Sequence, residues 1–195
     1  SAGAYCGGFV GQMFGPSGWD NTIRFNSCEF RGTLTAGEKS GGFVGLSYRY
    51  MTFNDCVFSG TLKVGKTAGG FIGFYSQYAW FGSYFNRCAS VGTVRITGTR
   101  STGIFASGYI GECETPAYFT DCLSAVDFGE SDKPYVTAGF IGHQTHFEAS
   151  FVRCISLVKA QNPTQYYNAS MIGKIDAKTG NSGSQKLYFE DCFTE

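Results

Sequence analysis

The sequence predicts an all-β fold, a right-handed parallel β-solenoid of about six coils, and three observations point to it. One short repeat occurs six times, apolar residues alternate with a period of two within it, and glycine occurs 28 times among 195 residues. Alternation with a period of two is typical of strands. Each glycine would cost a helix interior about 1 kcal/mol, so helical repeats of similar length are excluded.

The first repeat motif is Gly-Gly-aromatic-Val/Ile-Gly, loosened in its later copies. It spans residues 7–11, 41–45, 69–73, 107–111, 138–142 and 169–173. The fourth residue is β-branched in every copy, which suits a packed strand interior, so we expect this row to point into the core. The aromatic residue before it, as in Phe43 and Phe71, is expected to face the opposite side of the strand. There, linking segments or a second layer would cover it.

The second motif, Phe-x-x-Cys, alternates strictly with the first. It ends at Cys28, Cys56, Cys88, Cys122, Cys154 and Cys192, and the repeats lie near 7–28, 41–56, 69–88, 107–122, 138–154 and 169–192. We therefore expect a single repeat domain over residues 1–195. The chain begins within a first motif and stops three residues after Cys192, which predicts a segment excised from a longer protein.

The residue before each motif cysteine tests whether the coils stack in register. These residues are Ser27, Asp55, Arg87, Asp121, Arg153 and Asp191. In-register coils would place them about 4.8 Å apart on neighbouring strands. Opposite charges at such positions stabilise a sheet and like charges destabilise it. The alternation in sign therefore favours in-register stacking over scattered surface charge.

Six of the eight cysteines share one repeat position. In-register stacking would separate their Cβ atoms by about 4.8 Å, beyond the roughly 3.5–4.5 Å that a disulfide prefers. We therefore expect a column of buried thiols, each acting as a small hydrophobe. A reduced column suits a cell surface in an anaerobic habitat. Cys6 and Cys113 lie outside the column, about 14 Å apart along the stack, and are not expected to pair.

The segment from Phe53 to Leu62, followed by residues 68–73, resembles the GLUG motif, in which an Asn-Cys-tyrosine-rich segment leads into Gly-Gly-Leu-Val-Gly. The Phe-x-x-Cys spacing is also similar to the Gly-Gly-Ala-Ile and Phe-x-x-Asn repeats of chlamydial autotransporter adhesins. The resemblance covers essentially the whole chain and implies a repeat region of a bacterial surface protein or adhesin. This sequence departs from the pattern in having Phe for Leu and longer inserts. The motif residues are structural, so the resemblance implies no site residues.

The segments that link the two motifs hold most of the distinctive side chains. They include Trp19, Tyr48, Tyr50, Tyr75, Tyr78, Trp80, Phe81, Tyr84, Tyr118, His146 and Phe147. Repeat proteins often place such inserts on a binding face. If the chain binds a ligand, the sequence favours a strip over the second and third coils, formed by Tyr48, Tyr50, Tyr75, Tyr78 and Trp80. The alternative is that these aromatic rings cover the solenoid's own core.

His143, His146 and Glu148 form the only cluster with metal-like chemistry. Their spacing is not that of the zinc helix His-Glu-x-x-His, and the segment is not helical. We interpret them as ordinary loop residues. The sequence thus predicts no metal and no cofactor.

A polysaccharide-active enzyme is an alternative, because such enzymes include right-handed β-helices. It would need carboxylates that converge on one face, or a calcium site beside a basic residue. The acidic residues are spread along the chain, and only Glu112 and Glu114 with Glu130 and Asp132 are plausible neighbours. We therefore expect no catalytic residues.

An ice-binding protein is a further alternative, because a flat face with a regular threonine ladder can order water. Thr33, Thr61 and Thr93 occupy equivalent positions, but the row fails at Asp127 and Lys159. Three rungs are weak support for this function.

Charge and hydropathy limit the kinds of partner that the chain can have. Fifteen basic residues balance fifteen acidic ones, which argues against a nucleic-acid partner. No apolar run approaches the roughly 20 residues that span a bilayer, so no membrane insertion is expected in this segment. We expect a non-catalytic, extracellular module of a bacterial cell surface that serves adhesion through a host glycan or protein. A passive stalk or spacer is the alternative.

Overall fold

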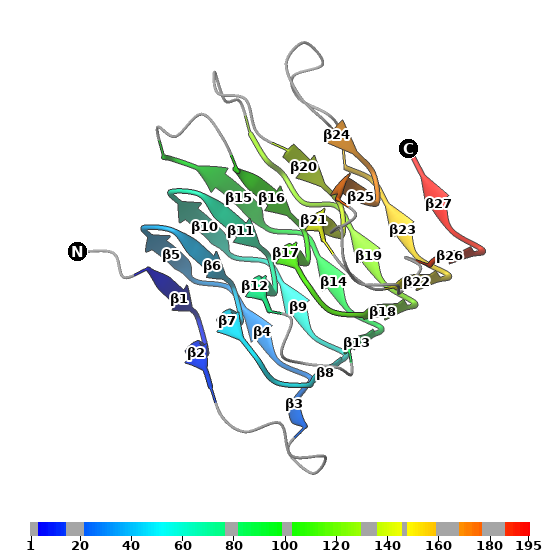
Figure 1. The fold of residues 1–195 in the computed structure, drawn as a ribbon, viewed down its shortest axis with the longest axis horizontal. Coiled ribbons are helices and arrows are strands. Elements are labelled where there is room, and N and C mark those ends of the chain that lie inside the picture. The colour runs from blue at the N-terminus through cyan, green and yellow to red at the C-terminus, as the bar shows by residue number, and fades with distance from the viewer. Residues whose placement is uncertain are drawn as a thin grey trace.

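The computed structural model describes residues 4–14, 22–76, 82–98, 103–129, 136–145, 148–158, 168–176 and 186–195. In these ranges every helix or strand element is a β-strand. Each strand pairs in parallel with the strand at the same position of the next coil (Figure 1). The predicted parallel β-solenoid is confirmed.

Five sheets run along the solenoid, numbered here in chain order. The first contains β1 (Tyr5–Gly7), β6 (Lys39–Gly41), β11 (Thr67–Gly69), β16 (Phe105–Ser107), β20 (Val136–Ala138) and β24 (Asn168–Ala169). The second contains β2 (Val10–Met13), β7 (Val44–Ser47), β12 (Ile72–Tyr75), β17 (Ile110–Cys113), β21 (Ile141–Gln144) and β25 (Ile172–Ile175). The third contains β3 (Ile23–Asn26), β8 (Met51–Asn54), β13 (Ser83–Asn86), β18 (Ala117–Thr120), β22 (Ala149–Val152) and β26 (Leu187–Glu190).

The last two sheets are made of shorter or fewer strands. The fourth contains β4 (Glu29–Phe30), β9 (Val57–Phe58), β14 (Ala89–Ser90), β19 (Leu123–Ser124), β23 (Ile155–Ser156) and β27 (Phe193–Thr194). Among the described residues, the fifth contains β5 (Thr33–Ala36), β10 (Thr61–Val64) and β15 (Thr93–Ile96), and a bridge from Thr93 to Asp127 extends it by one coil. About four coils thus contribute to all five sheets, fewer than the six predicted, although six repeats contribute to each of the other four.

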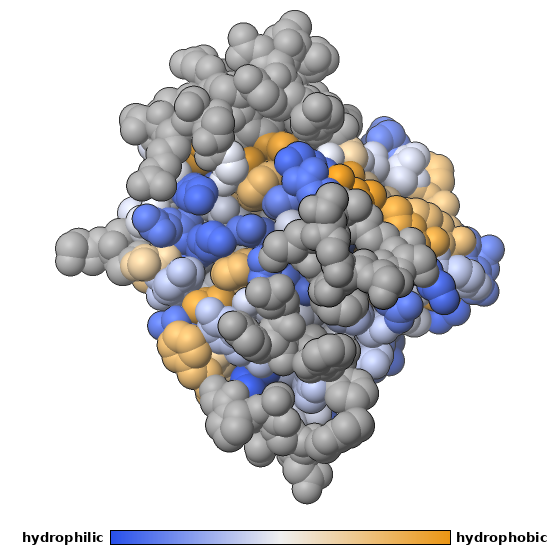
Figure 2. Space-filling view, in the orientation of Figure 1, coloured by the Kyte–Doolittle hydropathy of each residue, from blue (hydrophilic) through white to orange (hydrophobic). Residues whose placement is uncertain are grey.

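The outward positions of the fourth sheet are largely apolar. Val57, Ala89, Leu123, Ile155 and Phe193 lie in register there. Their inward neighbours from Phe58 to Ser156 are buried. Figure 2 shows apolar residues gathered over the C-terminal strands of this sheet.

The Val/Ile row of the first motif points into the core, as predicted. Val44, Ile72, Ile110 and Ile141 have no exposed surface and belong to one hydrophobic cluster. The two end members, Val10 and Ile172, are partly buried against the same cluster. β-branched side chains restrict their own rotamers, which suits a packed strand interior.

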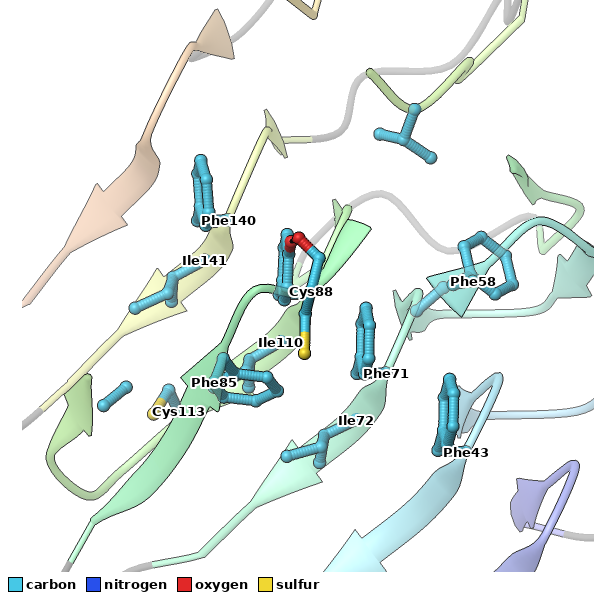
Figure 3. Packing of buried hydrophobic residues seen from close by; sticks show 14 of the residues in the cluster. Phe43, Phe58, Phe71, Ile72, Phe85, Cys88, Ile110, Cys113, Phe140 and Ile141 are labelled. Atoms are coloured by element: carbon cyan, nitrogen blue, oxygen red, sulfur yellow. Dashed lines mark hydrogen bonds between the residues drawn. The ribbon is translucent and has the colours of Figure 1, made fainter. Parts of the chain in front are cut away.

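The aromatic row of the first motif does not face the opposite side of the strand, so that prediction is wrong. Phe43, Phe71 and Phe140 are fully buried in the same cluster as the Val/Ile row (Figure 3). The aromatic residue lies at a corner, since β6 ends at Gly41 and β7 begins at Val44. The in–out alternation of a strand is therefore not carried across it. The corner is tight: a Cβ atom on Gly41 would lie 2.3 Å from the carbonyl oxygen of Val44.

Two ladders of aromatic rings fill the solenoid. In the first, Phe43 and Phe71 stack with centroids 4.7 Å apart, and the phenylalanines of the second motif form the other, with Phe53 and Phe85 4.9 Å apart. Rings of the two ladders meet edge to face, as Phe71 and Phe85 do at 5.6 Å. Both geometries are favoured by the ring quadrupole. The aromatic residues of the two motifs therefore form the core of the solenoid.

The corner before each motif cysteine has an unusual backbone. All six residues there have positive φ between 50° and 55°, a left-handed conformation that non-glycine residues seldom adopt. Arg87 donates two hydrogen bonds to Asp55, at 2.7 and 2.8 Å. Arg153 does the same to Asp121, at 2.6 and 2.8 Å. The alternating charges therefore pair between coils, which confirms in-register stacking.

All eight cysteines are free thiols. From Cys56 onward, each Sγ of the column lies within hydrogen-bonding distance of a carbonyl oxygen in the preceding coil, for example 3.3 Å from Cys56 to Phe25 and 3.4 Å from Cys88 to Phe53. The column expected from the repeat is confirmed. Cys113, outside it, is fully buried, and burial raises the pKa of its thiol to about 12.

Candidate ligand-binding face

The outward face of the third sheet carries a row of tyrosines. In β8, Met51 and Phe53 point into the core while Thr52 and Asn54 point outward. Residues in register with Thr52 form what we call the outer row. It consists of Arg24, Thr52, Tyr84, Tyr118, Ser150 and Tyr188. Three of its six members are tyrosines whose rings are not needed to fill the core.

Tyr84 and Tyr118 stack on each other. Their centroids are 4.8 Å apart and their planes differ by 15°. Tyr84 is 44% exposed and Tyr188, two coils beyond Tyr118, is 52% exposed. Exposed rings of this size are the kind of side chain that anchors a partner.

Carboxylates hold the phenol groups in place. The Tyr118 hydroxyl donates to Glu148 and the Tyr188 hydroxyl donates to Glu190. Burial raises the pKa of Tyr118 above its usual value, and the hydrogen bond to Glu148 raises it further. The bond to Glu190 raises the pKa of Tyr188. Both phenols are therefore neutral donors at physiological pH.

A hollow of about 570 Å³ lies between Tyr118 and Tyr188. Its lining consists of Tyr118, Glu148, Ala149, Ser150, Lys186, Leu187 and Tyr188. Ser150 occupies the rung of the outer row between the two tyrosines. Because serine is small, the hollow opens where a third ring would otherwise stand.

The strip predicted from the linking segments is only partly described. Tyr75 is fully buried, which corrects its assignment to an exposed strip; burial raises its pKa. Tyr50 packs against the core, and the Tyr48 ring stacks on Phe14 with centroids 5.1 Å apart. The other two members, Tyr78 and Trp80, lie outside the described residues.

The outer row could have been found from the sequence. Tyr84 and Tyr118 each directly precede the phenylalanine of a second motif, so alternation places them outward if that phenylalanine points inward. Tyr188 has the same place before Phe189. The tyrosines of the outer row lie in the third, fourth and sixth repeats, whereas the predicted strip follows the inserts of the second and third.

The residues of the suspected metal cluster have separate partners. His143 Nε2 lies 3.0 Å from Asp176 Oδ2, and its Nδ1 lies 4.0 Å from Glu112 Oε1. Glu148 accepts the hydrogen bond of Tyr118 instead. His146 lies outside the described residues. Among the residues that the structure describes, no three His, Cys, Asp or Glu side chains are placed to hold a metal ion.

The acids considered for catalysis are engaged in structural contacts. Lys39 Nζ lies 2.6 Å from Glu112 Oε2 and 3.6 Å above the ring of Phe74. Glu114 accepts a hydrogen bond of 3.1 Å from Ser76. Glu130 and Asp132, their expected neighbours, lie outside the described residues.

The three threonines at equivalent positions of the repeat lie in register, as the sequence predicts. Thr61 pairs with Thr33 on one side and with Thr93 on the other, and Thr93 bridges to Asp127. Lys159 lies outside the described residues. Three threonines thus form the row before a carboxylate follows, and among the described residues the fifth sheet has the fewest strands.

No protein-family model, no curated protein and no solved structure matches the chain. In the parts of the chain that the structure describes, there is no helix of the length and hydropathy needed to cross a membrane.

Proposed function

We propose that the chain is a non-catalytic module of an extracellular bacterial surface protein, and that it contacts a ligand through the outer row of the third sheet. The observation that carries this proposal is the hollow between Tyr118 and Tyr188, beside the stacked pair of Tyr84 and Tyr118. These rings exceed what packing requires, because Phe85 and Phe119 on the inward side already fill the core.

The repeat supports a rigid presentation of this face. Tyr84 and Tyr118 are flanked by residues that pair with both neighbouring coils, and Tyr188 is flanked by residues that pair with the preceding coil. Little ordering is then required on binding, and preorganisation improves affinity. A host glycan or protein is the proposed partner, and the resemblance to repeats of bacterial adhesins supports an extracellular location.

Tyr48 and Tyr50, together with Tyr78 and Trp80, stay a second proposed contact surface. The apolar outward positions of the fourth sheet offer further area, including Ile155 and Phe193. From Val57 to Phe193 its side chains have no hydroxyl or charge to orient a ligand, and Glu29, in register with Val57, is engaged by Arg31 and Ser59. The outer row has both, so it is the preferred site.

A passive stalk is the second candidate function. Ladders that only connect coils favour it, for example the side chains of Asn26, Asn54 and Asn86, which are joined by hydrogen bonds of 2.8 and 2.9 Å. Such ladders stiffen the solenoid and need no ligand. A stalk requires no tyrosines on its surface.

The test combines a glycan array with a pull-down of host surface proteins. The chain should bind in at least one of them, and replacing Tyr84 and Tyr188 by Ala should abolish binding without lowering the melting temperature. Replacing Tyr48 by Ala serves as the matched control on the second surface. Binding that depends on Tyr48 instead would transfer the function to that surface, and absence of any ligand would leave the stalk.

A further inference from the structure

We infer that the hollow above Ser150 is a subsite for one pyranose ring of a glycan, stacked on the open face of Tyr118. This inference rests on the proposed function and names its ligand class.

The spacing leaves room for one ring. Tyr84 covers one face of the Tyr118 ring at 4.8 Å. The other face of Tyr118 points along the row toward Ser150, because coils follow one another in a single direction. Tyr118 and Tyr188 are two coils apart, roughly 9.6 Å. A ring placed above Ser150 would therefore contact Tyr118 as Tyr84 does on the other side.

The hydroxyl bonds set the directions of the two phenol groups that border the hollow. Glu148 lies two residues before Ser150 in its coil, whereas Glu190 lies two residues after Tyr188. Because Tyr118 donates to Glu148 and Tyr188 donates to Glu190, the two rings lean toward opposite ends of their strands. Both rings thus have a fixed direction before any ligand binds.

The rim favours a sugar over an apolar side chain. Glu148 supplies carboxylate acceptors, Lys186 an ammonium donor and Ser150 a hydroxyl at the floor. A phenylalanine or leucine of a partner protein would remove these groups from water without replacing their hydrogen bonds, which is costly. A pyranose has a face of C–H groups for the ring of Tyr118 and a rim of hydroxyls for the polar groups. One acid and one base on the rim suit a neutral sugar.

Saturation-transfer NMR on the whole chain tests the subsite directly. The probes are the methyl glycosides of glucose, mannose, galactose and N-acetylglucosamine, with p-cresol standing in for an aromatic side chain of a partner protein. At least one glycoside should receive saturation through its ring C–H protons. Replacing Ser150 by Tyr would complete the tyrosine row and fill the hollow, and binding should weaken roughly tenfold or more, the loss expected when a stacking contact is blocked.

Thr52→Tyr is the matched control, since it adds a tyrosine to the same row on the far side of Tyr84. It should keep glycoside binding, and both variants should keep the melting temperature of the parent chain. Unchanged binding by Ser150→Tyr, an equal loss in Thr52→Tyr, or a Ser150-sensitive signal from p-cresol alone would each overturn the subsite. If the array or pull-down finds a ligand that Ser150→Tyr still binds, the proposed function stands and only the subsite fails.

Discussion

Tyr109 is the only member of the first aromatic ladder that carries a hydroxyl. Fully buried, it donates to the carbonyl oxygens of Cys88 at 2.7 Å and of Leu123 at 2.9 Å. Replacing it by Phe should lower the free energy of unfolding by about 1–2 kcal/mol, since a buried bond is lost and its acceptors are less well satisfied. Urea denaturation measures this change. Tyr84→Phe, at an exposed position, is the control, and equal effects of the two variants would contradict the assignment.

His143 should make stability depend on pH. Burial lowers its pKa more than the hydrogen bond to Asp176 and the charge of Glu112 raise it, and Lys174 lowers it further. The folded state thus favours neutral histidine, whereas the unfolded side chain titrates near pH 6.5. The contribution of neutral His143 to stability is fully present above pH 6.5. It is lost as the pH drops through 6.5 toward the lower pKa of the folded state.

The melting temperature should accordingly decrease between pH 7.5 and pH 5. His143→Phe, which keeps a ring against Phe105 at a 4.4 Å stack, should flatten that dependence. The pKa of Asp176 is lowered, chiefly by its hydrogen bond with Lys174. This carboxyl therefore titrates at a lower pH and does not contribute to the change between pH 7.5 and pH 5. A variant with the same slope as the parent would assign the pH dependence to other groups.

At the scale of single elements, the column of thiols gives a chemical test of register. Five cysteines are buried and three are partly exposed. A thiol reagent should therefore react slowly with most of the native protein. After unfolding without a reductant, all eight thiols should react, and a count below six would mean that column cysteines are bridged and the register is wrong.

Sequence patterns predicted the strands and their stacking better than they predicted the corners. The Val/Ile row and the charge column follow from periodicity alone, because both lie at fixed places in every repeat. Alternation predicts the wrong side for Phe43, because it ends at a corner that the sequence pattern does not mark. The sequence assigns Tyr75 to an insert, yet Tyr75 is in register with Ser47 and Cys113 and points into the core.

The candidate site, like the fold, can be predicted from the sequence only in part. Outward placement of Tyr84 and Tyr118 follows from the phenylalanine that comes after each of them. The hollow does not, since it depends on which carboxylate each phenol reaches and on one small side chain between two large ones. Tyr118 reaches a carboxylate 30 positions along the chain, in the next coil, whereas Tyr188 reaches one two positions along its own strand.

At the scale of the whole molecule, stability should be graded along the axis. Phe53 and Phe85, in inner coils, have no exposed surface, whereas Phe9 is 47% and Phe189 is 49% exposed. In a repeat array each coil is stabilised mainly by its neighbours. Amide hydrogen exchange should be fastest in β2, β26 and β27 and slowest in β8, β13 and β18. Uniform protection would indicate instead that the array unfolds as one cooperative unit.

In the third sheet, the residues that stabilise the coil point inward and the residues that form its surface point outward. Its inward position is phenylalanine in all six repeats, from Phe25 to Phe189, while the outer row changes from charged to hydroxyl to aromatic over the same six rungs. A mutation in the outer row therefore changes the surface of the coil and leaves the inward phenylalanines in place. Under the proposed function, new binding specificities would arise one rung at a time, by point mutation or by exchange of whole repeats, while the scaffold stays constant.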